Sequence, residues 1–520
     1  MMTRRRSSFA GTVSNSGLIY NVIMKNTPVI ISYLLPRLRD ILFGTVFATV
    51  VFLGPALFNR DGDLGWHVAI GNFILDTRTI PLTDIFSHTM NGVRFVPHEW
   101  LAEVAFAFAY RLMGLSGDVL LTALLASITI VLVYEELVKR GAFRFVALFV
   151  TLWVSFVAAV HLLARPHMFT LLFVVIWTYW LEGVYKGEEK KIWCFPLLML
   201  IWANTHGAFF AGFVIWGTYL ADWILSYWQG CGTKEMGKQL ALIGLLSFVV
   251  TFINPSGIYL WETTVGFVGN SYLTSNILEY LSPDFHNKAM WSFMFMVAFA
   301  LFALSQERRI QIREALLLAG WAAMSLYSVR NMPLFAVITA PIYGALIQAW
   351  AEKLSVLEKW DSNLKETEKA LRGWVWMILP TLFFGYVLWT GVLIDEKGTG
   401  NIFLPDKMPV QAVEWLQENP QDGKLFNDYI WGSYVLFRMW PAQTVFIDAR
   451  TDFYGEKLLR EYADVIHLSD DWEDILDKYE VAWMLIPRNG ALARYFYSVD
   501  TDDWNVIYED DIAVIFRRGD

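Results

Sequence analysis

The sequence predicts an all-α polytopic membrane domain of about eleven spans, followed by a C-terminal α/β domain on the outer face. The chain of 520 residues is 56% hydrophobic and only 18% charged, whereas a soluble protein carries about 25% charged residues. Long apolar stretches recur between residues 41 and 394. After Leu393 the chain holds 25 acidic and 12 basic residues, a net charge of −13, which leaves 25 acids, 29 bases and +4 for the rest. This acidic tail argues against a nucleic-acid partner.

Each predicted span is an apolar segment of roughly the 20 residues that a bilayer requires. The segments are 41–58, 117–138, 143–163, 168–185, 192–206, 208–228, 238–254, 289–306, 312–329, 332–350 and 374–393.

The stretch 101–114 is also apolar, but it is short and Glu103 and Arg111 interrupt it, which predicts a helix lying in the interface. With this helix on the surface and the N-terminal tail (1–40) in the cytoplasm, 22 of the 29 bases before Ile394 fall on the inner side. A span at 101–114 would reverse every later loop and place most of these bases outside.

This topology divides the chain into the cytoplasmic tail 1–40, the transmembrane domain 41–394 and an extracytoplasmic domain 395–520. It also places the loops 59–116 and 255–288 outside, and the charged, helical segment 351–373 inside. In the last domain, strand-like runs alternate with helical patterns at 410–418 and 456–466, which is typical of a small α/β domain. The predicted strands are Thr444–Ile447, Val481–Ile486 and Ile512–Arg517.

Polar residues gather at the outer ends of the predicted spans. They include Asp61, Asp63, His67, His98 and Glu99 in the first outer loop, and Arg165, His167, His206, Arg330 and Asn331 at later span ends. Ionisable groups at membrane depth are costly, so such clusters are candidates for function. Taken singly, each has a structural alternative: a solvated loop carboxylate, a histidine satisfied by neighbouring helices, or an anchor to lipid headgroups. Convergence on one face favours the functional interpretation.

Several classes of site are not indicated. Cys194 and Cys231 provide no disulfide framework, and the histidines lack the spacing of a zinc site. There is no Walker A sequence and no Gly-X-Gly-X-X-Gly. An Asp-X-Asp such as Asp61-Gly62-Asp63 can hold a divalent cation, Mg²⁺ or Mn²⁺, and this cofactor stays open.

The layout resembles the membrane glycosyltransferases of the GT-C fold. The stretch from Asp61-Gly62-Asp63 to Pro97-His98-Glu99-Trp100-Leu101 resembles their first outer loop, and Leu163–Met168 resembles the second, although many members have Asp where this chain has His167. In the tail, residues 426–432 and 446–450 resemble an uncharacterised bacterial branch. The chain is also distantly similar to the mannosyltransferases, aminoarabinose transferases and oligosaccharyltransferases.

The resemblance implies an inverting enzyme that transfers a sugar from a polyprenyl-phosphate donor to a glycan, lipid or protein acceptor. It points to an acidic residue just after the first span as the catalytic base. We favour Asp63, with Asp61 supporting it or holding the metal. We expect Asp63 to begin a helix whose free N–H groups lower its pKa, and Arg60 to hold Asp61.

The remaining site residues follow from the same chemistry. The departing phosphate needs positive charge or strong hydrogen-bond donors. The candidates are Arg165, His167, Arg330, Asn331, His67, His98, Glu99 and His206. On the acceptor side we place Asp428, Tyr429, Asp448 and Arg450, with the alternative that the last two pair within the fold.

Two other classes of function compete with an enzyme. A lipid or glycan transporter would carry polar residues near the bilayer midplane, often in repeated halves, and neither is visible here. A non-catalytic assembly factor would use its acidic tail to bind a partner.

Overall fold

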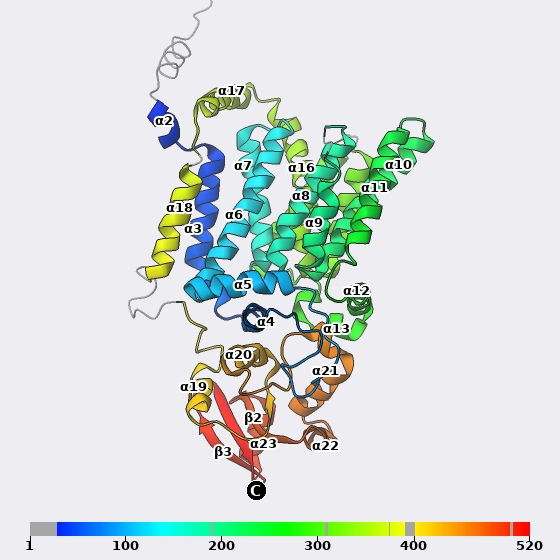
Figure 1. Ribbon diagram of the computed structural model, residues 1–520. Helices are drawn as coiled ribbons and strands as arrows, with labels where there is room; N and C mark the ends of the chain where they lie inside the picture. The colour runs from blue at the N-terminus through cyan, green and yellow to red at the C-terminus, as the bar shows by residue number, and fades with distance from the viewer. Residues whose placement is uncertain are drawn as a thin grey trace, which may run out of the picture.

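The structure, a computed structural model, describes residues 29–188, 191–306, 310–373, 375–390, 401–499 and 503–519. Most of the predicted N-terminal tail (1–28), the end of the last predicted span (391–393) and the start of the tail domain (395–400) lie outside the described residues. A bundle of upright helices carries a small sheet-containing domain at one end (Figure 1).

A helix occupies every predicted span within the described residues. Seven of these helices are long and apolar enough to cross a membrane, or eight if the bent pair α17–α18 counts as one span. The seven contain α3 (Leu38–Phe58), α6 (Leu115–Lys139), α7 (Arg144–Ala158), α8 (His167–Tyr185), α10 (Phe210–Trp228), α14 (Trp291–Ser305) and α16 (Met332–Ala351). The other predicted spans contain α9 (Cys194–Ala203), α11 (Lys234–Val250), α15 (Ile312–Tyr327) and α18 (Val375–Thr390), none of which is among the seven.

Helices α4 (Asp63–Thr77) and α5 (Trp100–Met113) lie across the ends of the upright helices (Figure 1). This is the orientation that the interfacial interpretation of 101–114 predicts. The two helices pack closely at Gly71, where a Cβ atom would lie 2.0 Å from the backbone oxygen of Glu103. Helices α12 (Tyr259–Gly269) and α13 (Ser271–Asn276) lie at the same end, whereas α2 (Val29–Leu34) and α17 (Ser355–Ala370) lie at the opposite end.

The C-terminal domain is built on a four-stranded sheet of order β1-β2-β4-β3. Strands β1 (Lys424–Asn427) and β2 (Val481–Pro487) are parallel, and β4 (Ala513–Arg518) runs antiparallel to both β2 and β3 (Trp504–Glu509). The helices are α19 (Val410–Glu418), α20 (Tyr429–Met439), α21 (Thr451–His467), α22 (Trp472–Lys478) and α23 (Ala491–Ser498). The predicted strands 481–486 and 512–517 and the two predicted helices are confirmed.

The predicted strand Thr444–Ile447 is wrong. The backbone N–H of Val445 donates to Phe86 O (3.2 Å), and Val445 O accepts from the N–H of His88 (3.0 Å). These backbone groups therefore bind the first outer loop and form only an isolated bridge. The apolar run is buried because it lies between the loop and the domain, and not because it belongs to the sheet.

The terminal domain shares a hydrophobic core with the bundle. One buried cluster joins Leu64 and Ile70 of α4 to Trp431 and Tyr434 of α20. At the contact, a Cβ on Gly65 would lie 2.6 Å from Ser433 O, so only glycine allows this approach of the two helices. The domain is thus held directly over α4, where Asp63 begins the helix.

The topology predicts that the terminal domain and the α10–α11 connection face opposite sides of the membrane. Asp406, exposed in the domain, and Cys231, exposed in the connection, are suitable probes. In a Cys194→Ser, Cys231→Ser background, we expect Asp406→Cys to react with an impermeant maleimide on intact cells. The matched protein that retains only Cys231 should react only after permeabilisation, and the reverse pattern would overturn the assignment of sides.

Candidate functional site

The predicted carboxylates Asp61 and Asp63 meet Arg165 at the domain-bearing end of the bundle. Arg165 Nε and Nη2 lie 2.6 and 2.7 Å from the two oxygens of Asp61. Its Nη1 lies 2.9 Å from Asp63 Oδ2 and 3.0 Å from Glu279 Oε1. The four residues come from three separate segments of the chain, around the start of α4, before α8 and after α13, and a single guanidinium joins all three.

Asp61 and Asp63 differ in their surroundings. Asp61 presents both oxygens to Arg165 and its side chain is 10% exposed, whereas Asp63 contacts Arg165 through one oxygen and is 22% exposed. Helix α4 begins at Asp63, as predicted. The predicted partner Arg60 is exposed, and Arg165 holds Asp61 in its place.

The expected lowering of the Asp63 pKa is wrong. Burial raises the pKa of Asp63 to about 7, against the opposing charge of Arg165 and with the support of the neighbouring Asp61 and Glu279 carboxylates. One guanidinium shared among three carboxylates cannot neutralise them all, so the helix N-terminus is outweighed. A carboxyl group that titrates near pH 7 suits a general base.

A second group, the Glu99 cluster, consists of Glu99, His67, His98 and His206. The Glu99 carboxylate lies 3.4 Å from His206 Nε2, 3.7 Å from His98 Nε2 and 3.8 Å from His67 Nδ1. Burial lowers the pKa of His67 and of His206, so both are neutral at pH 7. Although burial opposes it, Asp452 and Glu99 raise the pKa of His98, which makes it the member of the cluster most readily protonated.

Arg330 differs from Arg165 in its direct partners. Within the described residues it forms no ion pair with a carboxylate; Nη1 donates to Tyr280 Oη (2.5 Å), and Nη2 lies 3.4 Å from His206 Nε2. His206 Nδ1 lies 2.9 Å from the hydroxyl oxygen of Thr170 and accepts from the backbone N–H of Ala208 (3.4 Å), and with Nδ1 as the acceptor the ring proton is assigned to Nε2. Two N–H donors therefore lie side by side, an arrangement that suits an anion.

His167 and Asn331 are satisfied within the fold. His167 Nε2 lies 2.9 Å from His161 O, and the two imidazole rings are 4.4 Å apart. Asn331 donates to Met324 O (3.0 Å) at the end of α15. Their contacts support the ends of α8 and α15.

Sequence reasoning missed Glu279 and Tyr280. They lie in a 3₁₀ turn (Leu278–Tyr280) of the outer loop 255–288, where Glu279 contacts Arg165 and Tyr280 contacts Arg330. The signal that could have indicated them is a glutamate followed by a tyrosine, in a loop that the predicted topology places on the outer face.

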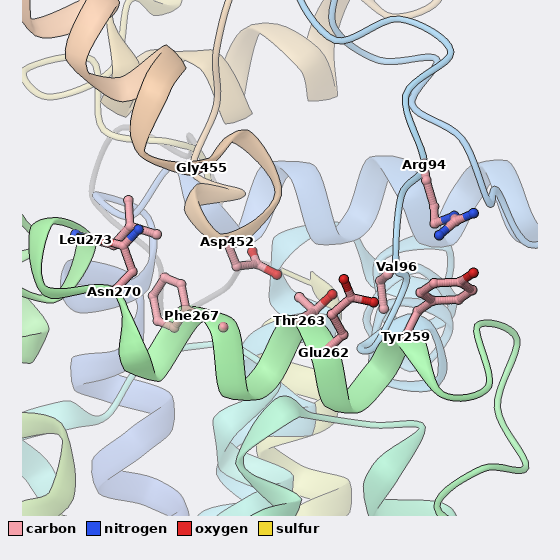
Figure 2. A pocket seen from close by; sticks show the side chains of 11 residues that line it. Arg94, Val96, Tyr259, Glu262, Thr263, Phe267, Asn270, Leu273, Asp452 and Gly455 are labelled. Atoms are coloured by element: carbon pink, nitrogen blue, oxygen red, sulfur yellow. Dashed lines mark hydrogen bonds between the residues drawn. The ribbon is translucent and has the colours of Figure 1, made fainter.

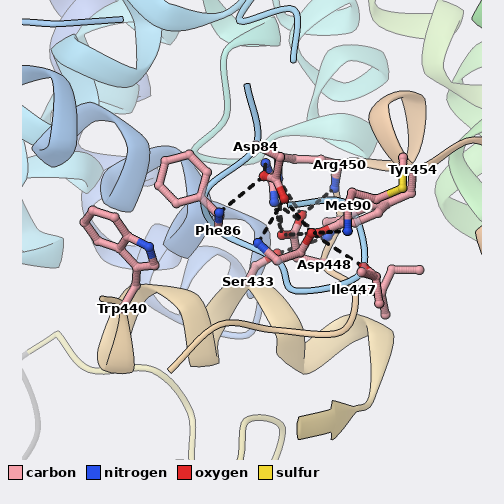
Figure 3. A network of polar contacts seen from close by, with 12 residues as sticks. Asp84, Phe86, Met90, Ser433, Trp440, Ile447, Asp448, Arg450 and Tyr454 are labelled. Atoms are coloured by element: carbon pink, nitrogen blue, oxygen red, sulfur yellow. Dashed lines mark hydrogen bonds and ion pairs between the residues drawn. The ribbon is translucent and has the colours of Figure 1, made fainter. Parts of the chain in front are cut away.

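Asp448 and Arg450 form a buried network with Asp84 (Figure 3). Arg450 Nη1 lies 2.7 Å from Asp84 Oδ1, Nη2 lies 2.7 Å from Asp448 Oδ2, and Tyr454 Oη donates to Asp448 (2.8 Å). The Phe86 ring of the loop lies 5.3 Å from the guanidinium carbon. These ion-paired side chains are at most 1% exposed, which turns Asp448 and Arg450 away from an acceptor and makes them the link between outer loop and domain.

Asp428 and Tyr429 lie at the start of α20. Asp428 Oδ1 caps the helix by accepting from the N–H of Ile430 (2.9 Å). Tyr429 Oη shares a short hydrogen bond with Thr451 Oγ1. Burial and the neighbouring Asp63 raise the pKa of Tyr429, so its hydroxyl stays protonated beside the carboxylates.

A cavity of about 310 Å³ lies between α12, α21 and the segment that carries Arg94 and Val96 (Figure 2). Its wall includes Arg94, Tyr259 and Glu262, with Asp452 from the start of α21. The Arg94 guanidinium lies 3.8 Å from the Tyr259 ring centre. Asp452 also lies 3.7 Å from His98 Nδ1, so the cavity opens beside the cluster. A polar wall with an aromatic ring suits a hydroxyl-rich molecule.

The chain matches no protein-family model and no curated protein. Among solved structures it is similar to the archaeal oligosaccharyltransferase AglB from Archaeoglobus fulgidus, in complex with an inhibitory peptide and a dolichol-phosphate. The TM-score is 0.58 at 13% identity, over 86% of this chain and 69% of that one. A structure of the Archaeoglobus fulgidus oligosaccharyltransferase with zinc and sulfate gives 0.56 at 14% identity, over 86% and 68%.

ArnT from Cupriavidus metallidurans, in the apo state, matches with a TM-score of 0.47 at 13% identity, over 92% of this chain and 97% of that one. The oligosaccharyltransferase matches show that this multi-pass membrane protein has the GT-C glycosyltransferase fold, as the sequence resemblance predicted.

The Arg450 network predicts a large loss of stability when one partner is removed. Arg450→Ala leaves two buried carboxylates without their cation, which costs about 3–5 kcal/mol. The control is Arg488→Ala, whose partner Glu509 lies 2.6 Å away at the surface; such pairs contribute about 0–1 kcal/mol. We expect Arg450→Ala alone to lower the unfolding temperature in detergent and to expose residues 78–99 to protease. Equal behaviour of the two variants would contradict the docking role.

Proposed function

We propose that the chain is a membrane glycosyltransferase that moves a sugar from a polyprenyl-phosphate-linked donor to an acceptor on the outer face. In this proposal the N-terminus is cytoplasmic, and the terminal domain is extracytoplasmic. The observation that carries the proposal is that two adjacent residues of one turn, Glu279 and Tyr280, contact the two different arginines of the site. Glu279 contacts Arg165, which also contacts Asp63, a carboxyl group suited to accept a proton. Tyr280 contacts Arg330, a cation suited to bind a phosphate.

Arg330 and His206 form the donor side. A prenyl chain would lie among the apolar helices, with its phosphate at the bundle end where these N–H donors meet. As the bond between the sugar C1 and the phosphate oxygen breaks, negative charge grows on the phosphate. Fixed donors then stabilise the departing group more than the bound donor. Arg165 is less suited to this task because carboxylates already engage its three nitrogens.

Asp63 forms the acceptor side. It takes the proton of the acceptor hydroxyl or amide while the acceptor atom attacks C1 on the face opposite the phosphate, so a single displacement inverts the anomeric centre. Asp63 is preferred to Asp61 because it is more exposed and has only one oxygen on Arg165. The acceptor, a glycan, lipid or protein, would approach from the cavity bordered by Tyr259 and Asp452.

The base assignment predicts that Asp63→Asn lowers the transfer rate by roughly 10²–10⁴-fold, because proton removal is lost. Asp61→Asn should be less impaired, since Asp61 acts by holding Arg165. The matched control is Asp76→Asn, an exposed carboxylate on the same helix that pairs with Arg111. Transfer from a defined polyprenyl-phosphate sugar is the measurement. Full activity of Asp63→Asn would favour the transporter or assembly-factor alternative.

The same assignment predicts a pH profile. A base must be ionised, so kcat/KM should rise with pH through about 7, the region to which burial raises the pKa of Asp63, and then level off. The charged groups facing Asp63 are Arg165, Asp61, Glu279 and Asp448. A rate that stays constant from pH 5.5 to 8.5 would contradict Asp63 as the base.

The donor assignment predicts that Arg330→Gln weakens binding of a prenyl phosphate by roughly 10–100-fold, the worth of a hydrogen bond to a charged group. Arg60→Gln is the control, because Arg60 is an exposed arginine just beyond the first span on the same side. Binding of a fluorescent polyprenyl phosphate in detergent measures both. Equal loss in the two variants would indicate a general headgroup effect and no specific phosphate site.

A further inference from the structure

Arg165 occupies the centre of a set of oxygen ligands. Four carboxylate oxygens, two from Asp61 and one each from Asp63 and Glu279, lie 2.6–3.0 Å from its nitrogens. Its Nε, Nη1 and Nη2 are all engaged. Asp61 lies in the loop after α3, Asp63 begins α4, Glu279 lies in the turn after α13, and the cation comes from the segment before α8. The three outer segments therefore meet on a positive charge that belongs to the chain itself.

Several carboxylates converging on one point are the ligands that hard divalent cations prefer. One of the similar structures was determined with zinc and sulfate. Here, however, a cation held by Asp61, Asp63 and Glu279 would have to take the place of the guanidinium. Arginine cannot lose its proton, so Arg165 would remain beside the metal as an uncompensated like charge, with its side chain only 20% exposed. The residues present do not fit a divalent metal alongside Arg165.

We propose that Arg165 is a built-in cation that replaces a divalent metal ion at this site, so that the protein folds its outer loops and carries out transfer without one. The role in transfer rests on the function proposed above; the metal exclusion does not. Arg165 is a positioning residue in this scheme, because it contacts the base and not the donor.

The guanidinium brings a property that a metal ion lacks. Its planar fork binds Asp61 through two parallel hydrogen bonds, which fixes the orientation of that carboxylate. The remaining Nη1 is shared between Asp63 and Glu279, so each gives it only one oxygen. Lysine, a point charge with no fork, should not substitute.

The decisive experiment replaces the Arg165 guanidinium with a carboxylate that can bind a metal ion. In Arg165→Asp, four carboxylates surround the space that the guanidinium filled. We expect this variant to bind Mn²⁺ at least about 100-fold more tightly than the wild type, measured by the loss of the free Mn²⁺ signal in electron paramagnetic resonance. Mn²⁺ should also raise its unfolding temperature. The wild type should show neither response, and EDTA should change neither its stability nor its transfer rate.

Matched variants identify the site. Arg330→Asp makes the same charge change near Glu99 and Tyr280 but without the three carboxylates, so it should not gain tight Mn²⁺ binding. Adding Asp61→Asn to Arg165→Asp should abolish the gain. If Arg165→Asp does not fold, Arg165→Ala purified with Mn²⁺ provides the same comparison, because its three carboxylates also lack their cation.

The proposal would be overturned if the wild type bound Mn²⁺ or Zn²⁺ tightly at this site. Such binding would persist in Arg330→Asp and in Asp76→Asn and would be lost in Asp61→Asn. The proposal would also be overturned if Arg165→Asp and Arg165→Ala both fold but neither binds Mn²⁺ more tightly than the wild type. These readouts need no turnover. A wild type that transfers no sugar, together with an Arg165→Asp that gains the metal, would reject the proposed function while leaving the cation replacement intact.

Discussion

The buried contact of Arg450 with Asp84 and Asp448 is the constraint on which the site depends. A guanidinium at most 1% exposed, with its charge partners on two different parts of the chain, cannot be separated from either without leaving a buried charge. The first outer loop is therefore tied to the terminal domain between α4 and α5. The same domain packs its helix α20 against α4, the helix that Asp63 begins.

Two further arginines of the site, Arg165 and Arg330, differ in the charges that surround them. Arg165 is surrounded by carboxylates and makes a nearly closed set of ion pairs, whereas Arg330, within the part of the chain that the structure describes, forms its hydrogen bonds with a phenol and an imidazole. A sequence shows both as arginines at the outer ends of spans and gives no reason to treat them differently. The neighbouring groups distinguish the two arginines, because a cation already surrounded by carboxylates attracts a phosphate only weakly.

The sequence predicted the features that local pattern determines. The length of the apolar segments predicted the helices, and the interruption at Glu103 and Arg111 predicted that α5 lies across the bundle. Strand-like runs between helical patterns predicted β2 and β4. It could not predict what long-range contacts decide. Glu279 is one carboxylate in a loop until folding brings it to Arg165, and the pKa of Asp63 depends on burial that no local pattern records. The edge strand β3 was missed because its side chains are largely exposed and lack a clear apolar alternation.

The domain that covers the site belongs to the part of the chain after Leu393, which holds half of the acidic residues and a net charge of −13. Glu262 and Asp452 continue this negative surface to the wall of the cavity. Such a surface acts on charged molecules before they make contact with it. It slows the approach of polyanionic molecules and attracts cationic ones, over a range of about 8 Å at physiological salt, and leaves neutral molecules unaffected. Ionic strength therefore sets how sharply the protein discriminates by charge, independently of the shape of its binding cavity.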